Sequence, residues 1–156
     1  MRGPTTTILL AAALSIGGVM ANPAYAAASA VTPERVCGPG FARVAHSKQA
    51  VKTPGKRVLG YVYLLYNRRT GYNCVTTFKT SDVGVSTFVM ATITVQTRGT
   101  RPRVSGENEG RRVKHYLGPV KTYGKGRCVK YMGTIEDGGR GLTDAKSRWK
   151  SWGNCG

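Results

Sequence analysis

The feature that most constrains the fold is a pair of strand-like runs joined by a short turn. Val58–Tyr66 reads VLGYVYLLY and Tyr72–Lys79 reads YNCVTTFK, and both runs are rich in β-branched and aromatic residues. The five residues between them, NRRTG, begin with Asn67 and end with Gly71, which suits a type I turn closed by a residue in the left-handed conformation. This stretch therefore predicts an antiparallel β-hairpin.

Alternation within the candidate strands predicts which side chains face the interior, because successive side chains of a strand point to opposite faces. Along Tyr72–Lys79 one alternating set contains a cysteine and both aromatic residues, so we expect it to face inward: Tyr72, Cys74, Thr76 and Phe78. The run Phe88–Thr97 (FVMATITVQT) predicts a third strand, with inward residues Val89, Ala91, Ile93 and Val95 and outward residues Thr92, Thr94 and Gln96.

The rest of the chain also favours short strands over helices. Helical periodicity is weak, and Val-, Tyr- and Thr-rich runs recur between Gly, Pro and Asn clusters. Further strands are expected near Phe41–His46 and at Val113–Leu117, Pro119–Tyr123 and Arg127–Ile135. Glycines and a proline punctuate Arg98–Arg112, which predicts a long loop, and Leu142–Trp152 fits either a short helix or an irregular strand. The predicted fold class is all-β: a single compact antiparallel β-sandwich or barrel-like domain.

The N-terminus has the pattern of a secretory signal peptide. Arg2 precedes the apolar run Ile8–Met20, whose thirteen residues are too few to span a bilayer. The small residues around Ala26 predict cleavage after Ala26, with competing sites up to Ala30; a buried N-terminal core helix is the alternative. We therefore expect a signal peptide at 1–26, export by the general secretory route, no transmembrane anchor, and one secreted domain at 27–156.

Four cysteines lie in the expected mature chain: Cys37, Cys74, Cys128 and Cys155. An even number in an exported chain favours two disulfides. The spacings contain no Cys-x-x-Cys pair and no histidine placed to complete a zinc site, so no metal or other cofactor is expected. Three pairings are possible from the sequence alone. Sequential pairing is preferred, because Cys37–Cys74 and Cys128–Cys155 would each staple one half of the chain.

The chain is strongly basic. After loss of the signal peptide, 23 Lys and Arg residues face 7 Asp and Glu residues, a formal charge of +16. Outside a bacterial-type cell this charge favours anionic polymers such as teichoic acids and acidic polysaccharides, anionic lipid headgroups and released nucleic acid, without specific nucleic acid recognition. The basic stretch supplies the candidate polyanion-binding residues Arg98, Arg101, Arg103, Arg111, Arg112 and Lys114. The alternative is that these residues form only a solvated loop.

Candidate catalytic groups are few. A ribonuclease-like site would use His115 as acid, Glu107 or Glu109 as base, and Arg111 or Arg112 on phosphate. Nothing in the sequence fixes a base opposite His115, and an ordinary strand histidine is the simpler interpretation.

Two other groups of residues give only weak support for a catalytic or binding site. A His46, Ser47 and Asp82 triad lacks the Gly-x-Ser-x-Gly elbow of hydrolases, so no catalytic residue is predicted. The cluster Arg148, Trp149, Lys150 and Trp152 could stack on sugars or bases or sit at lipid headgroups, or it could simply pack beside Cys155.

Several fragments together resemble the spore-associated protein A family, small exported proteins of streptomycetes and related actinobacteria. They are CGPGFARVAHS from Cys37, GYVYLLYNRRTGYNCVTTFKT from Gly60, YLGPVKTYGKGRCVKYMGTI from Tyr116, and the terminal NCG. The resemblance implies a secreted or spore-associated location. It carries no established catalytic activity, so no functional residue is transferred, and the stretch Arg98–Arg112 is more basic than expected for the family.

The function expected from residues and resemblance together is that of an exported, non-enzymatic protein of the spore or cell surface. Its charge would give it weak binding to anionic cell-wall or spore-surface polymers. The alternative is a secreted basic nuclease or a cationic antimicrobial protein.

Overall fold

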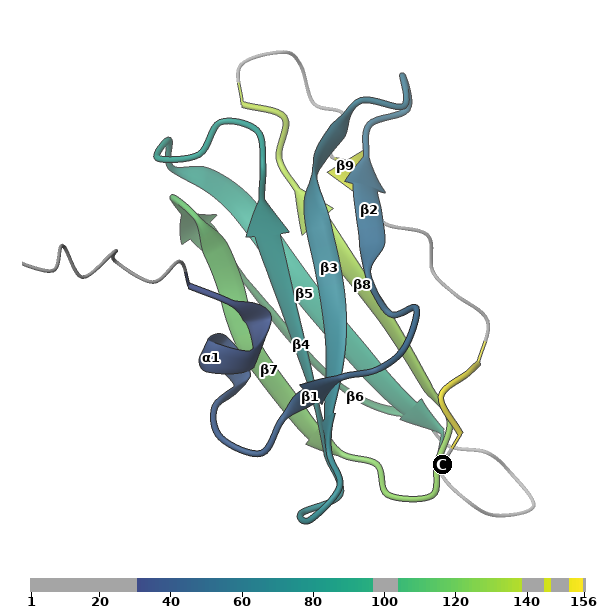
Figure 1. Cartoon of the computed structure of the whole chain (residues 1–156). Coiled ribbons are helices and arrows are strands. Elements are labelled where there is room, and N and C mark those ends of the chain that lie inside the picture. Colours follow the sequence, from purple (N-terminus) through teal and green to yellow (C-terminus); the bar gives the residue numbers. More distant parts are fainter. Residues whose placement is uncertain (1–30, 97–103, 139–144, 147–151, 156) are drawn as a thin grey trace, which may run out of the picture.

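The computed structural model of the chain describes residues 31–96, 104–138, 145–146 and 152–155. Within them one short helix precedes a series of strands (Figure 1). The elements are α1 (Pro33–Cys37), β1 (Ala42–Arg43), β2 (Gln49–Lys52), β3 (Val58–Asn67), β4 (Tyr72–Lys79), β5 (Thr87–Gln96), β6 (Val104–Val113), β7 (Tyr116–Tyr123), β8 (Val129–Ile135) and β9 (Ala145–Lys146). No helix in the described part of the chain is long and apolar enough to cross a membrane.

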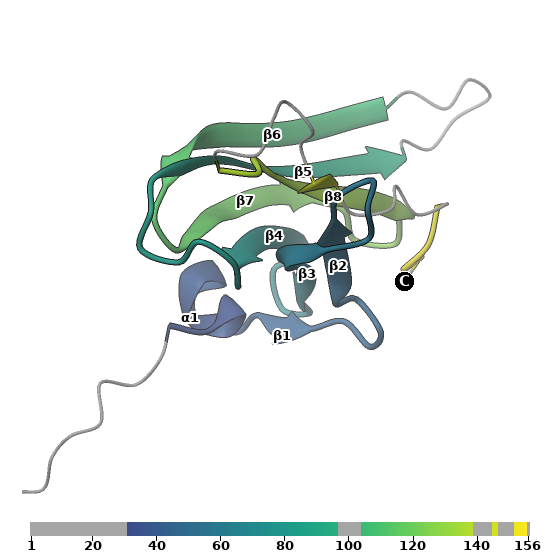
Figure 2. The same ribbon diagram turned by 90° about the horizontal axis from the view of Figure 1, so that it is seen from above.

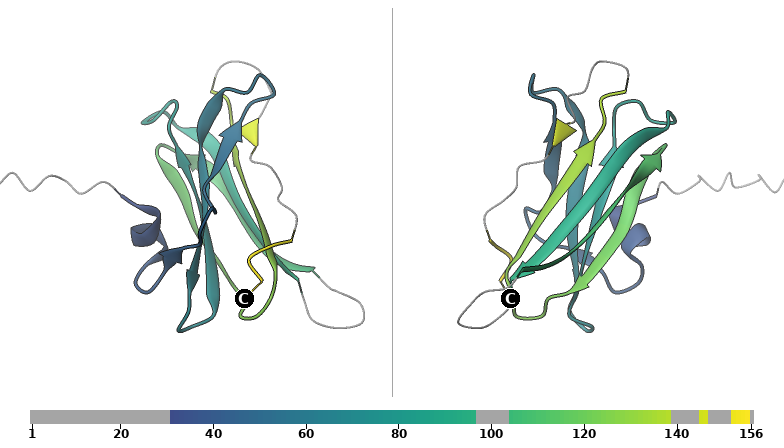
Figure 3. Two further views of the ribbon diagram at one scale, coloured as in Figure 1. Left: turned by 45° about the vertical axis from the view of Figure 1, so that its right-hand side comes forward. Right: turned by 180° about the vertical axis from the view of Figure 1, so that it is seen from behind.

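The strands form one antiparallel sheet that folds over on itself. Neighbouring strands follow the order β6-β5-β8-β9-β2-β3-β4-β7, and β1 pairs with β3 outside this path. Seen from above, β2, β3 and β4 form one layer and β5, β6 and β8 the other, with β9 connecting β8 to β2 (Figures 2 and 3). The predicted class, an antiparallel all-β domain with disulfides, is confirmed.

The hydrophobic core fills the space between the two layers. The predicted inward face of β5 is confirmed, because Val89, Ala91, Ile93 and Val95 are all fully buried. The opposite layer contributes buried residues that include Leu64 and Val75. Burying one such aliphatic side chain stabilises a fold by roughly 1.5 to 3 kcal/mol. Thr94, expected to point outward, is also buried; it pairs across the strands with Lys130, whose ammonium lies against the Trp152 ring.

The predicted inward face of β4 is wrong. The main core receives Val75, whereas Cys74 belongs to a second, smaller buried cluster with Cys37 and Leu65 on the other side of the sheet. Tyr72 from the predicted set is exposed. The physical reason is that α1 and its disulfide cover the outer face of β4, so that residues on both faces are buried and alternation alone does not mark the core side.

The expected loop at Arg98–Arg112 is also largely wrong. Residues 104 to 113 form β6, which pairs with β5 along its whole length, from Gln96 opposite Val104 to Thr87 opposite Val113. The chain then bends at Lys114 and His115 before β7 begins, so no strand spans Val113–Leu117. Pairing with a long, buried neighbour overrides the poor strand propensity of Gly, Asn and Glu.

The remaining strand predictions agree more closely with the structure. The hairpin β3–β4 and strand β8 are confirmed. The early edge strand is reduced to β1, and β2 was not predicted. Most of Leu142–Trp152 lies outside the described residues; of that segment, β9 pairs with both β2 and β8.

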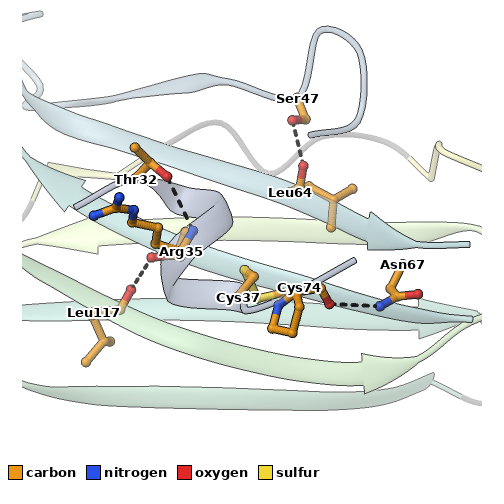
Figure 4. Close-up of a disulfide and its surroundings, with 10 residues drawn as sticks. Thr32, Arg35, Cys37, Ser47, Leu64, Asn67, Cys74 and Leu117 are labelled. Atoms are coloured by element: carbon orange, nitrogen blue, oxygen red, sulfur yellow. Dashed lines mark hydrogen bonds between the residues drawn. A yellow bond between two sulfur atoms is a disulfide. The ribbon is translucent and has the colours of Figure 1, made fainter. Parts of the chain in front are cut away.

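Two disulfides tie the ends of the domain to the sheet. Cys37–Cys74, with Cα atoms 6.0 Å apart, joins α1 to β4 (Figure 4). Cys128–Cys155 joins the start of β8 to the C-terminal segment. This is the sequential pairing that the sequence analysis preferred. At the start of α1, the Thr32 hydroxyl accepts a hydrogen bond from the Arg35 amide at 3.3 Å, which caps the first turn.

Candidate functional site

The predicted polyanion-binding residues do not form one free basic patch among the described residues. Arg98, Arg101 and Arg103 lie outside the described residues. Arg111 forms an ion pair with Glu109, two residues earlier on β6. Arg112 forms an ion pair with Glu136 at 3.1 Å. Both described arginines are therefore partly neutralised by carboxylates of the same molecule.

The ribonuclease-like constellation is not assembled. His115 lies in the bend after β6, while Glu107 and Glu109 lie within that strand. An extended strand rises about 3.3 Å per residue, so roughly 13 Å of chain separates Glu109 from the end of β6 at Val113. Glu109 is moreover engaged by Arg111.

The triad-like constellation is not assembled either. The Ser47 hydroxyl is buried and donates to the Leu64 carbonyl at 2.8 Å. Asp82 lies in the connection between β4 and β5, beside Ser81. That connection bonds to Leu59, at the other end of β3 from Leu64. Ser47 therefore has a structural role in this fold.

A pocket of about 760 Å³ lies at the end of the molecule where β3 turns into β4 and β7 leads into β8. Tyr66 and Asn73 line it and are direct cross-strand neighbours on β3 and β4. Strand alternation places them on the same face as the core residues Leu64 and Val75. The pocket is therefore the open end of the space between the two layers.

The rim of this pocket comes from segments far apart in the sequence. The β3–β4 turn contributes Arg68 and Arg69, and the β7–β8 connection contributes Gly124 and Gly126. The C-terminal segment adds Asn154 and Cys155, and the segment around β1 adds small apolar residues together with Arg43, which forms an ion pair with Glu34. In Figure 1 the β3–β4 turn, the β7–β8 connection and the C-terminal segment lie at the lower end of the molecule, with β1 above them.

Asn67 holds the β3–β4 turn in place. Its side-chain oxygen accepts hydrogen bonds from the Arg69 and Thr70 amides, both at 3.1 Å, and its side-chain nitrogen donates to the Pro39 carbonyl at 3.3 Å (Figure 4). Asn commonly closes turns in this way. The side chain therefore fixes the two arginines relative to the segment that follows α1.

A second contact fastens the same turn to the β7–β8 connection. The Gly124 amide donates to the Gly71 carbonyl at 3.0 Å. Gly71 has a φ of 74°, and a Cβ there would lie 2.8 Å from both Tyr123 and Lys125. A side chain at this position would therefore be both strained and crowded, so glycine allows the two turns to pack closely.

The described turns at this end carry only positive side-chain charges. The described turns 67–71, 124–128 and 152–155 carry Arg68, Arg69, Lys125 and Arg127 and contain no Asp or Glu. Arg68 and Arg69 are exposed and have no ion pair or side-chain hydrogen bond among the residues that the structure describes. Like charges gathered at a concave surface attract anions.

The opposite end of the molecule contains carboxylates, and two of its cations, Arg57 and Lys79, have partners within the fold. Arg57 forms an ion pair with the buried Asp137, and this hydrogen bond raises the pKa of the Arg57 guanidinium. The buried Lys79 ammonium donates to the Val85 carbonyl at 2.7 Å. Burial lowers the pKa of Lys79, while Asp82 and Glu136 oppose the shift. These contacts have a structural role.

Aromatic rings on the outer face of β3 also have intramolecular partners. The Arg43 guanidinium lies 4.9 Å from the Tyr63 ring centre and 2.7 Å from Glu34. The Lys48 ammonium lies 4.0 Å from the Tyr61 ring centre. These rings are therefore covered by cations of the same chain.

The C-terminal tryptophan cluster is described only in part. Arg148, Trp149 and Lys150 lie outside the described residues. Trp152 receives the Lys130 ammonium at 4.5 Å from its ring centre, and Gly153 bridges to Val129. For Trp152 this agrees with packing near Cys155.

No group of three or more metal-ligating side chains occurs in the described part of the chain.

The paired arginines of the β3–β4 turn were not predicted from the sequence as a candidate site. The signal was present as NRRTG, in which two adjacent cations follow an Asn that favours a turn. The sequence could not show that this turn meets the β7–β8 connection and the C-terminal segment.

The fold and the pocket define a disulfide-linked antiparallel β-domain with basic turns at one end. The chain is similar over its full length to a curated protein, spore-associated protein A of Streptomyces coelicolor: the two are 29% identical over 159 residues, which cover all of this chain and 90% of that one. This confirms the resemblance drawn from the cysteine-flanking motifs, at the level of a family relation. No protein-family profile matches the chain, and no solved structure matches it.

Proposed function

We propose that this is an exported, non-enzymatic protein that acts at the cell or spore surface, where it is held by salt-sensitive contacts to anionic polymers. The observation that carries the proposal is the concentration of unpaired cations, without carboxylates, in the turns around the end pocket. The spore-associated name of the relative supports the location. Basic polymer-binding surfaces need no further chemistry than this arrangement provides.

The physical consequence of the proposal is a contact governed by ionic strength. Exposed arginines bond phosphate or carboxylate oxygens through a planar fork of donors. In such a contact the interaction range shrinks from about 10 Å at 0.1 M salt to about 3 Å at 1 M. Binding should therefore be firm at low salt and lost as salt rises, whatever the repeat sequence of the polymer.

The experiment is retention of the mature protein on immobilised poly(glycerol phosphate) at graded salt. We expect the protein to bind at about 0.05 M salt and to elute well before 1 M. A neutral polysaccharide column serves as the control and should not retain it. Passage through the anionic column at low salt would contradict the proposal.

A further inference from the structure

We propose that the end pocket is a specific site for a phosphate group carried on a sugar or polyol. The inference rests on the proposed function, which brings the protein to phosphate-containing polymers, and it adds that one such unit enters this pocket. Arg68 and Arg69 would bind the phosphate, and the pocket floor at Tyr66 and Asn73 would receive the attached hydroxyl-bearing unit.

The arginines are presented on a rigid support. Asn67 uses both side-chain atoms to hold their turn, Gly71 bonds to Gly124, and the Cys37–Cys74 disulfide anchors the adjacent β4. Rigid placement lowers the cost of ordering long side chains when a ligand binds. This distinguishes the two arginines from exposed cations that lack such support.

The size of the pocket favours more than a bare anion. A volume of about 760 Å³ falls in the range of small-molecule sites. The buried amide of Asn73 and the half-buried ring of Tyr66 lie side by side on the inner face. An amide can bond hydroxyls, and an aromatic ring can pack on the apolar face of a sugar or polyol.

The pocket should bind phosphate in preference to carboxylate, because it presents two adjacent guanidinium groups, those of Arg68 and Arg69. A carboxylate presents two oxygens in one plane and matches one arginine fork. A phosphate presents oxygens in several directions and can accept from two forks at once. Two adjacent arginines without competing acidic residues in their turn therefore match phosphate better.

The test is calorimetric titration of the full mature protein with glycerol 1-phosphate. Three proteins are compared: the wild type, Arg68→Gln with Arg69→Gln, and Lys52→Gln with Lys56→Gln. The control removes the same charge from exposed positions outside the pocket. We expect one-site binding in the wild type and the control, and binding at least about tenfold weaker in the arginine variant. Equal affinity in the two variants, or no saturable binding to the wild type, would overturn the site.

Further titrations identify the ligand chemistry. Inorganic phosphate should bind more weakly than glycerol 1-phosphate, because it leaves the floor of the pocket unused, and glycerol alone should not bind. Binding of glucuronate as tight as that of glycerol 1-phosphate would overturn the choice of phosphate.

The polymer column separates failure of this inference from failure of the proposed function. If the wild type is retained and the arginine variant elutes earlier than the lysine control, the pocket is supported. If both variants elute together, the pocket is overturned while retention by overall charge stands. If the wild type is not retained at all, the proposed function itself fails.

Discussion

At the scale of single residues, Asn67 shows how one side chain positions a candidate site. It ends β3, and its hydrogen bonds reach its own turn and the Pro39 carbonyl after α1. The side chain is buried, so its loss would leave the Pro39 carbonyl and the turn amides without these partners. The two arginines beside it owe their placement to these bonds.

Replacement of Asn67 by Ala should lower the free energy of unfolding by about 1 to 3 kcal/mol, because several buried or half-buried polar groups lose a partner. Urea unfolding measures the change. Asn108→Ala, at an exposed position on β6, is the matched control and should shift stability by less than about 0.5 kcal/mol. Similar losses in both variants would contradict the role given to Asn67.

Tyr131 provides a second prediction at this scale. Its ring is buried, its hydroxyl donates to the Ser47 carbonyl, and burial raises its pKa, with the Gln49 side chain opposing the shift. A group whose pKa is higher in the folded protein than in the unfolded chain stabilises the fold. This stabilisation is complete at pH values below the pKa in the unfolded chain, and it is lost as the pH rises through the pKa in the folded protein. The unfolding free energy should therefore fall above about pH 10.

Tyr131→Phe tests this assignment. It should cost about 0.5 to 1.5 kcal/mol at pH 7, through loss of the hydrogen bond to Ser47. It should also make the fall in stability between about pH 10 and 12 shallower than in the wild type. Denaturant titrations across this range give both quantities. If the unfolding free energies of the two proteins fell in parallel with rising pH, the buried hydroxyl would not be the cause of the loss of stability.

At the scale of elements, the hairpin β3–β4 and the inner face of β5 could be read from the sequence, because turn chemistry and period-two alternation are local signals. The core side of β4 could not, since α1 and the Cys37–Cys74 disulfide bury its second face. Strand β6 could not either, because its composition is loop-like and its conformation comes from pairing with β5. The pocket combines turns that lie far apart along the chain, and no local pattern joins them.

Hydrogen exchange provides the test for β6. Since β6 pairs with β5 along residues 104–113, every second amide of this segment should be protected, in the alternating pattern of an edge strand. Amide exchange measured by NMR decides this. Uniformly fast exchange over the segment would favour the loop expected from composition.

At the scale of the whole molecule, the described turns at the pocket end carry exposed arginines, and disulfides fasten both ends of the domain. Glu136 and Asp137 lie at the opposite end with partners of their own, whereas Arg68 and Arg69 have no ion pair among the described residues. Disulfides fix α1 and the C-terminal segment to the sheet. The basic end is therefore supported by a sheet that two disulfides link to the terminal segments.

Removal of the Cys37–Cys74 bond by paired Ser substitutions should destabilise the protein by about 3 to 4 kcal/mol, as expected for closing a loop of this length. Thermal and urea unfolding measure the loss. The Cys128–Cys155 pair, which spans a separation of 27 residues, should cost a similar amount. A change below about 1 kcal/mol would contradict a stabilising role for the bond.

Export supplies a further prediction at this scale. We propose that the secreted product begins at Ala27 and carries no free thiol, because the small residues before the cut suit a signal peptidase and all four cysteines are paired. Intact mass spectrometry with and without alkylation tests both points. A product that keeps residues 1–26 would contradict processing, and four alkylatable thiols would contradict the disulfides.

The measurement that tests the central claim most directly is NMR mapping of the surface that meets an anionic polymer. Short poly(glycerol phosphate) is added to the isotope-labelled mature protein at low salt, and amide shifts are followed. We expect the largest shift changes at the pocket end, in residues 67–71 and 124–128, and we expect them to disappear at high salt. Changes centred on β6 around Arg111 and Arg112, or changes that persist at high salt, would contradict polymer binding at the pocket end.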